Sequence, residues 1–421
     1  MAKILIHTLV FTPDGVSNAY LYRDLARELV RRGHQITVLT TTPHYNQVAA
    51  EMAAQPMVKR LGGIFRTSSL GGIRVIHIRV PRKSSGALMR TAAAVWFHLA
   101  TLLSGVFLIG RHDVVLASSP PLTIGLIGKA LAFLWGGRSA YIVQDVFPDG
   151  LIRQGKIRSP LLISSLGYIE KLVYGVNDRV VVIADSFAKI VRPRMRDPKK
   201  LRLIENFVDT EFYRPLPRHN EFSRAHSFDD RFVVSYIGNI GNAQDLRPVL
   251  EAAKELRNLP IRFVLVGDGI RRAQYDSEAH DLGLTNVVFL GYIPYEETPW
   301  ANASCDLGLV LLSPHVKDAG FPSKIYSIMS CGRAAVITAD EGSDLRRIVR
   351  ESGWGRIVRT EAYDEFIAAV RRAYEEREVL AAEGAVGRAY VEKNCSRAAA
   401  GAKYDRLISE LSSVQGQLAR V

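Results

Sequence analysis

The sequence predicts an α/β protein made of two doubly wound domains. Its 421 residues exceed the roughly 250–300 residues at which single hydrophobic cores stop growing. Short runs rich in Val, Ile and Leu alternate with amphipathic segments along the chain, a pattern typical of parallel sheets covered by helices on both faces. A connection that contains Pro and Arg, at residues 211–230, separates two such series.

The first series begins with an expected strand at residues 3–8. Leu21, Leu25 and Leu29 recur at helical spacing, and Gly33 is a typical residue just beyond a helix end. They predict a helix over residues 17–32. The other expected strands are 35–40, 74–79, 113–117, 139–144 and 179–183.

The second series follows the same alternation. Its expected strands are 232–237, 262–266, 287–290, 307–312, 334–338 and 355–358, and its expected helices include 245–256 and 271–282. We therefore expect a first domain at 1–210, a linker at 211–230, a second domain at 231–385, and C-terminal helices at 386–421 that pack back toward the first domain. In open parallel sheets, ligands bind beyond the carboxyl ends of the strands.

The composition is that of a globular protein from a reducing compartment. With 48% hydrophobic and 23% charged residues and no low-complexity tract, the chain is neither disordered nor fibrous in class. Cys305, Cys331 and Cys395 are far apart and form no CxxC pair, which argues against a disulfide framework or a zinc site. The first residues run into Pro and Gly too early for a signal peptide. A reducing cytosol fits these features.

Positive charge is concentrated in the first half of the chain. Residues 1–200 hold 27 Lys/Arg and 11 Asp/Glu, whereas the remainder holds 28 and 31, which divides the net +13 into +16 and −3. Eight basic residues and no acidic one lie between Lys59 and Arg90. This asymmetry indicates an anionic partner of the first half, such as a membrane surface, a phospholipid headgroup or a pyrophosphate. Nucleic acid ranks last, because the segment lacks interleaved aromatic residues.

Residues Thr91–Gly110 carry no formal charge over 20 positions. As a helix this segment is about 30 Å long, enough to span a bilayer. A single span would place the strands of one parallel sheet on opposite sides of the membrane, so we expect a core helix or an interfacial helix instead. The neighbouring basic segment favours membrane contact.

A loop followed by a helix predicts an anion site in the second half. The small-residue loop 318–323 follows the apolar run 307–312 and precedes a helical segment that begins near Lys324 and ends before Gly332. Backbone N–H groups and the positive end of a helix dipole converge at such a place, and Lys324 adds a full charge. A plain solvated loop is the alternative.

Four segments recur in the order and spacing of a known family. They are Tyr236-Ile237-Gly238-Asn239-Ile240-Gly241, the apolar strand closing on Gly267-Asp268-Gly269, the strand closing on Gly291-Tyr292-Ile293-Pro294, and Pro322-Ser323-Lys324 with Cys331-Gly332. Together they resemble the family 4 retaining glycosyltransferases of the GT-B type, which have two Rossmann-like domains facing a central cleft. Residues 29–40 and 204–215 resemble the family's early helix and strand and its connection into the second domain.

Two further segments resemble one branch of that family. Ser118-Ser119-Pro120-Pro121 and Gln144-Asp145-Val146-Phe147-Pro148-Asp149 are similar to the branch that builds bacterial O-antigens, capsules and colanic-acid-like polysaccharides, whose members include N-acetyl-L-fucosamine transferases. The resemblance implies transfer of a hexosyl or N-acetylhexosaminyl group, with retained anomeric configuration, from a nucleotide-sugar to a polyprenyl-pyrophosphate-linked glycan. A UDP-sugar is expected over a GDP-sugar, and no metal or other cofactor is expected. The expected location is the cytoplasmic face of the bacterial inner membrane, whose anionic surface is an expected partner.

The resemblance also implies residue roles. Lys324 would neutralise the departing phosphate, and Asp149 or Asp145 would act as the acceptor-side base, with helix capping as the alternative for both. Gly15, Val16 and Ser17 would face the sugar or acceptor. The implied donor-binding residues are Gly238, Asn239, Gly241, Asn242, Gly267, Asp268, Tyr292, Ile293, Asp318, Gly320, Phe321, Pro322 and Ser323.

Three departures from the family pattern put some of these roles in doubt. The family's Arg and Lys on the diphosphate are replaced by Asn239 and Asp245. Its two signature Glu positions fall on Ala319 and Ser327, with Asp318 as a possible substitute. Its first-domain catalytic His has no counterpart in the region of Ser118. A nucleotide-sugar 2-epimerase of the same fold and a non-catalytic nucleotide-sugar-binding relative therefore stay open as alternatives.

Overall fold

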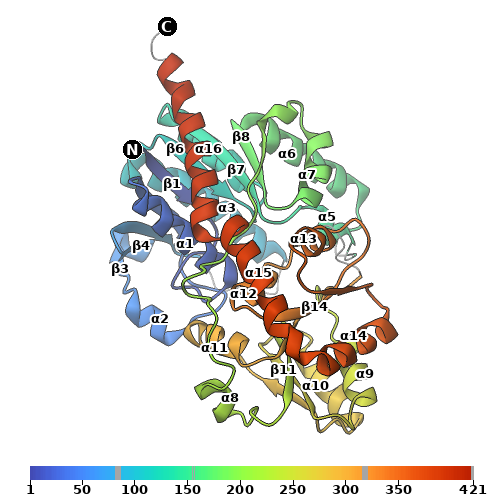
Figure 1. The fold of residues 1–421 in the computed structure, drawn as a ribbon. Coiled ribbons are helices and arrows are strands. Elements are labelled where there is room, and N and C mark those ends of the chain that lie inside the picture. Colours follow the sequence, from blue (N-terminus) through green and yellow to red (C-terminus); the bar gives the residue numbers. More distant parts are fainter. Residues whose placement is uncertain (81–86, 154, 156, 315–320, 419–421) are drawn as a thin grey trace. The chain divides into compact units, whose positions relative to one another are not determined.

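The computed structural model describes residues 1–80, 87–153, 155, 157–314 and 321–418 (Figure 1). The chain divides into two compact units. The first unit is Met1–Asn206 with Arg397–Val421, and the second is Phe207–Ser396.

The first unit is built on a nine-stranded sheet in the order β3-β4-β5-β2-β1-β6-β7-β8-β9. Strands β5 to β9 with β1 and β2 are parallel, as expected, but β3 and β4 extend the sheet as antiparallel strands that the sequence reading missed. The strands are β1 (Lys3–His7), β2 (Gln35–Thr41), β3 (Val58–Arg60), β4 (Phe65–Leu70), β5 (Ile73–Ile78), β6 (Val114–Ser118), β7 (Arg138–Val143), β8 (Arg179–Val182) and β9 (Leu201–Leu203).

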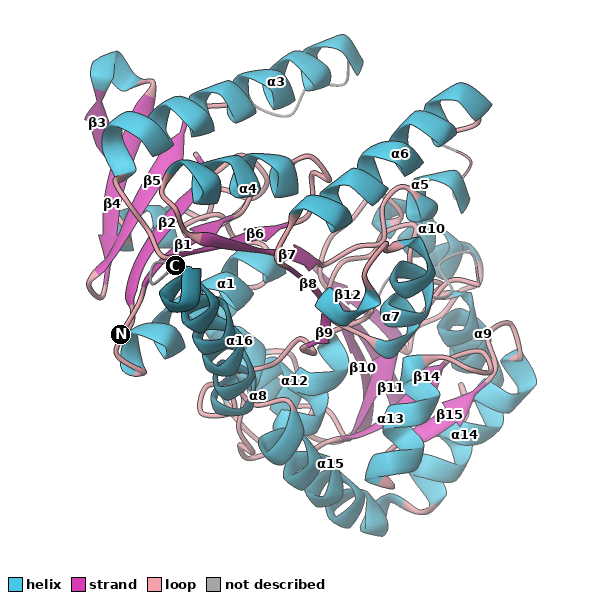
Figure 2. Cartoon of the chain, turned by 90° about the horizontal axis from the view of Figure 1, so that it is seen from above, coloured by secondary structure: helices cyan, strands magenta, loops and turns pink. Residues whose placement is uncertain are grey.

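Helices cover both faces of this sheet, as Figure 2 shows. On one face α1 (Ser17–Arg31) packs against α16 (Arg397–Leu418). On the other face α3 (Ala87–Ser104), α4 (Ile124–Leu134) and α6 (Pro160–Val176) lie in a row, with α4 in contact with both neighbours. The shorter helices are α2 (Ala49–Ala54), α5 (Asp149–Arg153), α7 (Asp185–Val191) and the turns Leu61–Gly63, Arg192–Arg194 and Pro198–Lys200.

Helix α3 has an unusual distribution of side chains. Thr101 and Ser104 face the protein together with Phe97, whose ring centroid lies 5.6 Å from that of His7 on β1. The π-helical turn η2 (Gly105–Ile109) continues the helix, and its Phe107 is 77% exposed. The segment is therefore a half-buried helix that carries large apolar side chains on its exposed side as well. No helix in the described part of the chain is both long enough and apolar enough to cross a bilayer.

The second unit holds a six-stranded, fully parallel sheet in the order β12-β11-β10-β13-β14-β15. This order is that of a dinucleotide-binding Rossmann domain. The strands are β10 (Phe232–Ile237), β11 (Ile261–Val266), β12 (Val287–Leu290), β13 (Leu307–Val310), β14 (Ala334–Thr338) and β15 (Arg356–Val358).

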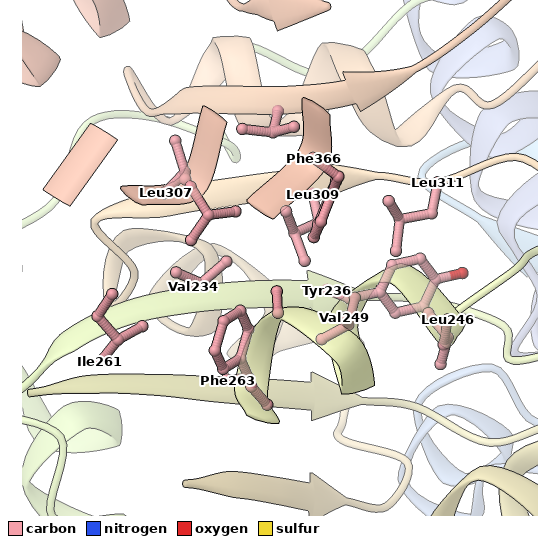
Figure 3. Packing of buried hydrophobic residues seen from close by; sticks show 14 of the residues in the cluster. Val234, Tyr236, Leu246, Val249, Ile261, Phe263, Leu307, Leu309, Leu311 and Phe366 are labelled. Atoms are coloured by element: carbon pink, nitrogen blue, oxygen red, sulfur yellow. The ribbon is translucent and has the colours of Figure 1, made fainter. Parts of the chain in front are cut away.

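The core of this unit lies between the sheet and its helices. Figure 3 shows Val234 and Tyr236 of β10, Phe263 of β11 and Leu309 of β13 packing against side chains of helices on one face of the sheet. The helices are α8 (Glu221–Ala225), α9 (Arg247–Glu255), α10 (Arg272–Asp281), α11 (Thr298–Ala303), α12 (Lys324–Ser330), α13 (Asp344–Ser352), α14 (Tyr363–Glu375) and α15 (Leu380–Asn394), with turns Tyr295–Glu297 and Arg377–Val379.

The unit boundaries differ from those expected. Residues 211–230 and α15 belong to the second unit, and only α16 returns to the first. Close backbone contact explains the position of α15, because a Cβ at Gly384 would lie 1.9 Å from the Gly332 carbonyl oxygen. Arg388 fixes the helix further by donating to the Ser330 carbonyl at 2.7 Å. In the first unit, Lys403 of α16 pairs with Glu205 at 2.5 Å.

Candidate functional site

The strand order of the second unit defines where a ligand binds. The connections leave β10 and β13 in opposite directions along the sheet, and the crevice beyond the carboxyl ends at such a switch point is where open α/β sheets take their ligands. The loop after β10 begins with Gly238, and the loop after β13 leads to Lys324, the first residue of α12. The structure therefore brings together the two segments that the sequence singled out most strongly.

Glycines allow the backbones of two neighbouring loops to touch at this crevice. A Cβ at Gly267, after β11, would lie 2.1 Å from the Gly238 carbonyl oxygen, and a Cβ at Gly269 would lie 2.3 Å from the Ile240 carbonyl oxygen. Both residues also have positive φ values, +132° and +156°, which side chains disfavour. The Ile240 N–H donates to the Asp268 carbonyl at 2.8 Å. The two loops thus form one compact backbone layer that a ligand can approach closely.

The amine of Lys324 lies directly over this layer. Its Nζ is 3.6 Å from the centre of the Tyr236 ring and 2.9 Å from where a Cβ of Gly238 would be. The Nζ atom is buried and has no hydrogen-bond partner among the described residues. Burial lowers the pKa of this amine from 10.5 to about 7, because a charge removed from water is costly. A buried amine is stabilised by a neighbouring negative charge, so this position suits an anionic group.

The other expected donor-side residues lie around the same loops with different exposure. Asn239, Asn242, Asp268, Tyr292 and Ser323 are partly or largely accessible, whereas Gly241 is buried. Ile293 packs against an apolar cluster under β12, and Phe321 and Pro322 precede α12, with the Phe321 ring 5.5 Å from that of Tyr326. Asp318, Ala319 and Gly320 lie outside the described residues.

Two of the departures from the family pattern have structural roles. Asp245 is buried and accepts hydrogen bonds from the Arg247 side chain at 2.6 and 2.9 Å. Burial disfavours its ionised form, but these bonds outweigh that cost and lower its pKa. The Ser327 hydroxyl donates to the Lys324 carbonyl within α12 at 2.8 Å. Both side chains are thus engaged within their own segments, and neither takes the place of the family's phosphate-binding or ribose-binding residues.

The first unit has a corresponding polar cluster at its own switch point, between β1 and β6. The hydroxyls of Tyr22 and Ser118 are hydrogen-bonded to each other. Ser119 accepts a hydrogen bond from the Gln144 N–H at 2.9 Å, and the side-chain amides of Gln144 and Asn206 exchange two bonds of 3.0 and 3.1 Å. These bonds hold the end of β6 against the end of β7, where Asp145 follows Gln144.

Asp145 and Asp149 have different environments. Asp149 begins α5, and both its oxygens accept hydrogen bonds from Arg194, at 2.7 and 2.8 Å, while the same guanidinium pairs with Glu170. Asp145 is accessible to solvent along one side, yet desolvation by the protein around it raises the pKa of its carboxyl. Asp149 is therefore held in a structural ion pair, whereas Asp145 is exposed near the carboxyl end of β7.

The loop Gly15–Ser17 is held mainly by its own neighbours. The Gly15 N–H donates to the Asn46 carbonyl at 2.8 Å, and a Cβ at Gly15 would lie 2.7 Å from the Val48 side chain. Buried Asp14 accepts from the N–H groups of His44, Tyr45 and Asn46. Gly15 is buried, Val16 is half-buried and Ser17 is exposed at the start of α1, so Val16 and Ser17 are the accessible positions.

The sequence reading missed several residues of these clusters. Tyr236 was quoted only as part of a strand, although its ring lies beneath the Lys324 amine. Tyr22 and Asn206 were not singled out, and they come from a helix and a connection far from Gln144 in sequence. An aromatic residue two positions before a strand-ending glycine was the one available signal for Tyr236.

Comparison with known proteins agrees with this arrangement. The model of the glycosyl transferase 4-like domain matches residues 17–206, and that of glycosyl transferases group 1 matches residues 218–388. The putative colanic acid biosynthesis glycosyl transferase WcaI of Escherichia coli is 25% identical over 94% of this chain and 97% of its own length. The probable glycosyltransferase WbjE of Pseudomonas aeruginosa is 28% identical over 58% of this chain, and the match spans 62% of WbjE.

The fold is also found in a solved structure. Anabaena Alr3699/HepE, in complex with UDP and glucose, aligns with a TM-score of 0.71 and 16% identity over 98% of this chain and all of its own. The two family models meet at the boundary between the two structural units and cover most of the chain between them. The chain is therefore a glycosyltransferase of the GT-B fold, with a glycosyl transferase 4-like unit followed by a group 1 unit.

Proposed function

We propose that this glycosyltransferase moves a sugar, with retention of configuration, from a UDP-sugar to a polyprenyl-pyrophosphate-linked glycan on the cytoplasmic face of a bacterial inner membrane. The observation that carries the proposal is the buried amine of Lys324 above the glycine loops of the second unit. This amine has no hydrogen-bond partner among the described residues, and a nucleoside diphosphate would place negative charge beside it.

The donor side of the proposal rests on the geometry of the crevice. Gly238 and Gly267 leave backbone exposed where the diphosphate approaches, and no side chain of these residues intervenes. When the bond between the sugar and the phosphate breaks, negative charge grows on the departing phosphate oxygen. The Lys324 ammonium then stabilises the transition state more than the ground state, which is a catalytic effect. The UDP and glucose in HepE support a uridine nucleotide as the donor.

The acceptor side would use the polar cluster of the first unit. Asp145 follows β7 at the carboxyl edge of the sheet, and its raised pKa moves its carboxyl toward the range in which a base works efficiently. We propose that it accepts the proton of the attacking hydroxyl. The name of WcaI, a putative colanic acid biosynthesis glycosyl transferase, supports an acceptor in surface-polysaccharide synthesis.

The proposed location at a membrane rests on the outer face formed by α3, α4 and α6. Large apolar side chains are exposed along all three helices: Val95, Trp96, Leu99, Leu103, Val106, Phe107, Phe133, Leu134, Leu161, Leu162, Tyr168 and Leu172. In α3 the inward face carries Thr101 and Ser104 beside Phe97 and Ala100, while Val95, Trp96, Leu99 and Leu103 are exposed. A helix with apolar residues on both faces fits an outer environment of lipid.

Charge supports the same location. Residues 79–172 contain basic runs before α3 and α6, and the acidic residue of α6, Glu170, is buried and paired with Arg194. An exposed apolar surface of this extent marks an interaction site, and the basic residues that precede α3 and α6 in the sequence fit anionic lipid headgroups. The membrane-contacting surface is thus wider than the segment Thr91–Gly110 that the sequence indicated.

Replacing Lys324 tests the catalytic proposal. Lys324→Ala is expected to lower turnover by about 10²–10³, the usual cost of losing one preorganised contact to developing charge. The assay follows nucleotide release from a panel of UDP- and GDP-sugars with a lipid-linked acceptor. Parallel reactions with EDTA report whether a metal is required, and NMR of the product reports the anomeric configuration. Lys254→Ala, on the exposed side of α9, is the matched control and should keep wild-type turnover. Turnover of Lys324→Ala within twofold of wild type would show that this residue takes no part in the chemistry. Isomerisation of the donor in the absence of an acceptor would instead indicate a nucleotide-sugar 2-epimerase.

Replacing the two acidic residues separates a base from an ion pair. Asp145→Asn should lower turnover while donor affinity and melting temperature stay unchanged, because the amide keeps the shape but cannot accept the proton. Asp149→Asn should lower the melting temperature, because Arg194 loses its bidentate ion pair with a carboxylate in a partly buried site. The opposite assignment of the two effects would return Asp149 to the role of base.

Replacing exposed apolar residues tests the membrane contact. Leu161→Gln in α6 should weaken co-sedimentation with anionic liposomes, and high salt should release the wild-type protein only in part, because apolar burial persists when charge is screened. Ile270→Gln is the control, since Ile270 is 81% exposed in the second unit and Leu161 is 82% exposed in the first. Equal loss in both variants, or no binding by the wild type, would contradict the proposal.

A further inference from the structure

A hollow of about 760 Å³ lies on the sheet extension of the first unit, formed by β3, β4 and β5 together with the end of η2. It involves none of the residues assigned above to the donor or the acceptor. Its volume is within the range of small-molecule sites, roughly 300–1,000 Å³. The question is what chemistry its lining would accept.

Strand register shows that the lining belongs to one face of the sheet. Arg60 of β3 lies opposite Phe65 of β4, and Thr67, two residues further along β4, lies opposite Ile76 of β5. Residues directly opposite each other, or two apart on a strand, share a face. Val58 and Arg74 are on this face by the same pairing, and Leu108 of η2 closes one side of the hollow.

The lining combines an apolar floor with two cationic side chains. Phe65 and Ile76 are buried at the base, and Val58 and Leu108 add further apolar surface. Arg60 and Arg74 are exposed beside them, and neither forms an ion pair with any residue in the described part of the chain. The Arg74 guanidinium donates to the Leu108 carbonyl at 3.1 Å, which orients it at the side of the hollow. An apolar chain that carries an anionic head matches both halves of this lining.

The position of the hollow indicates where such a molecule comes from. Leu108 lies next to Phe107, which belongs to the exposed apolar row of α3 and η2. The hollow is therefore continuous with the surface proposed to contact lipid. Arg guanidinium groups bind phosphate through paired hydrogen bonds, and the headgroups of anionic membrane lipids supply phosphates at that depth.

We propose that this hollow binds one molecule of an anionic phospholipid, with an acyl chain on Val58, Phe65, Ile76 and Leu108 and its phosphate between Arg60 and Arg74. This inference rests on the proposed membrane contact and is separate from the sugar-transfer chemistry. A lipid held in this way would fix the sheet extension to the membrane surface in one orientation, which an apolar helix surface alone does not do.

The test uses a short-chain phosphatidylglycerol below its critical micelle concentration, so that binding needs no bilayer. Native mass spectrometry and titration calorimetry on the full chain should show one bound lipid. Arg60→Gln should weaken the binding about tenfold, a usual cost of losing a hydrogen bond between charged groups. Lys59→Gln is the matched control. Lys59 is the neighbouring residue on the same strand and also loses one positive charge, but it lies on the opposite face, so this variant should bind within about twofold of wild type.

Further arms separate the two halves of the site. Val58→Asn should weaken lipid binding with an unchanged melting temperature, because Val58 is exposed at the edge of the sheet and contributes only apolar contact. Inorganic phosphate that binds as tightly as the lipid would reduce the hollow to an anion site and overturn the proposal. If short-chain phosphatidylcholine bound as tightly as phosphatidylglycerol, and Arg60→Gln had no effect, the proposed role of the two arginines would be overturned. Absence of monomeric lipid binding alongside intact liposome binding would overturn the hollow while leaving the membrane contact standing.

Discussion

The catalytic account depends on one constraint, an amine that is buried against backbone and has no hydrogen-bond partner among the described residues. Lys324 has its Nζ over the Tyr236 ring and close to Gly238, in a place where a side chain at Gly238 would collide with it. The cost of removing a charged amine from water is expressed as a pKa of about 7 instead of 10.5. This destabilisation of the folded protein grows as the pH falls below 10.5 and is complete below about 7, and a bound diphosphate would reduce it. The stability that this burial costs would then add to the affinity for the proposed donor.

The features proposed for catalysis and those proposed for membrane binding are concentrated in different units. The second unit holds the switch point, the glycine loops and the lysine, whereas the excess of positive charge and most of the exposed apolar residues lie in the first unit. The first unit also places Asp145 and the Tyr22–Ser118 pair at its own switch point. The proposed reaction, with a soluble donor and a lipid-linked acceptor, would use both kinds of surface, and these lie in separate units.

The fold and the donor loops could be predicted from sequence because they depend on local patterns. Glycines after apolar strands and a lysine after a small-residue loop are readable without tertiary information. The antiparallel strands β3 and β4 were missed because their short polar runs show little alternation, and their register is fixed by pairing with β5. The ion pair of Asp149 could not be predicted, because its partner Arg194 comes from a segment 45 residues away. The exposed apolar surface of α4 and α6 could not be predicted, because whether a leucine is exposed depends on how the helices pack in the folded protein.

Proton uptake on UDP binding tests the central claim most directly. At pH 8 the free Lys324 amine is mostly neutral, because its pKa is about 7, and a bound diphosphate raises that pKa and favours the charged form. Titration calorimetry in buffers of different ionisation enthalpy should therefore show uptake of about one proton per UDP at pH 8. UDP affinity should also fall as the pH rises above 7, and both effects should be absent in Lys324→Ala. Tight UDP binding by the wild type with no proton uptake at pH 8 would contradict the account.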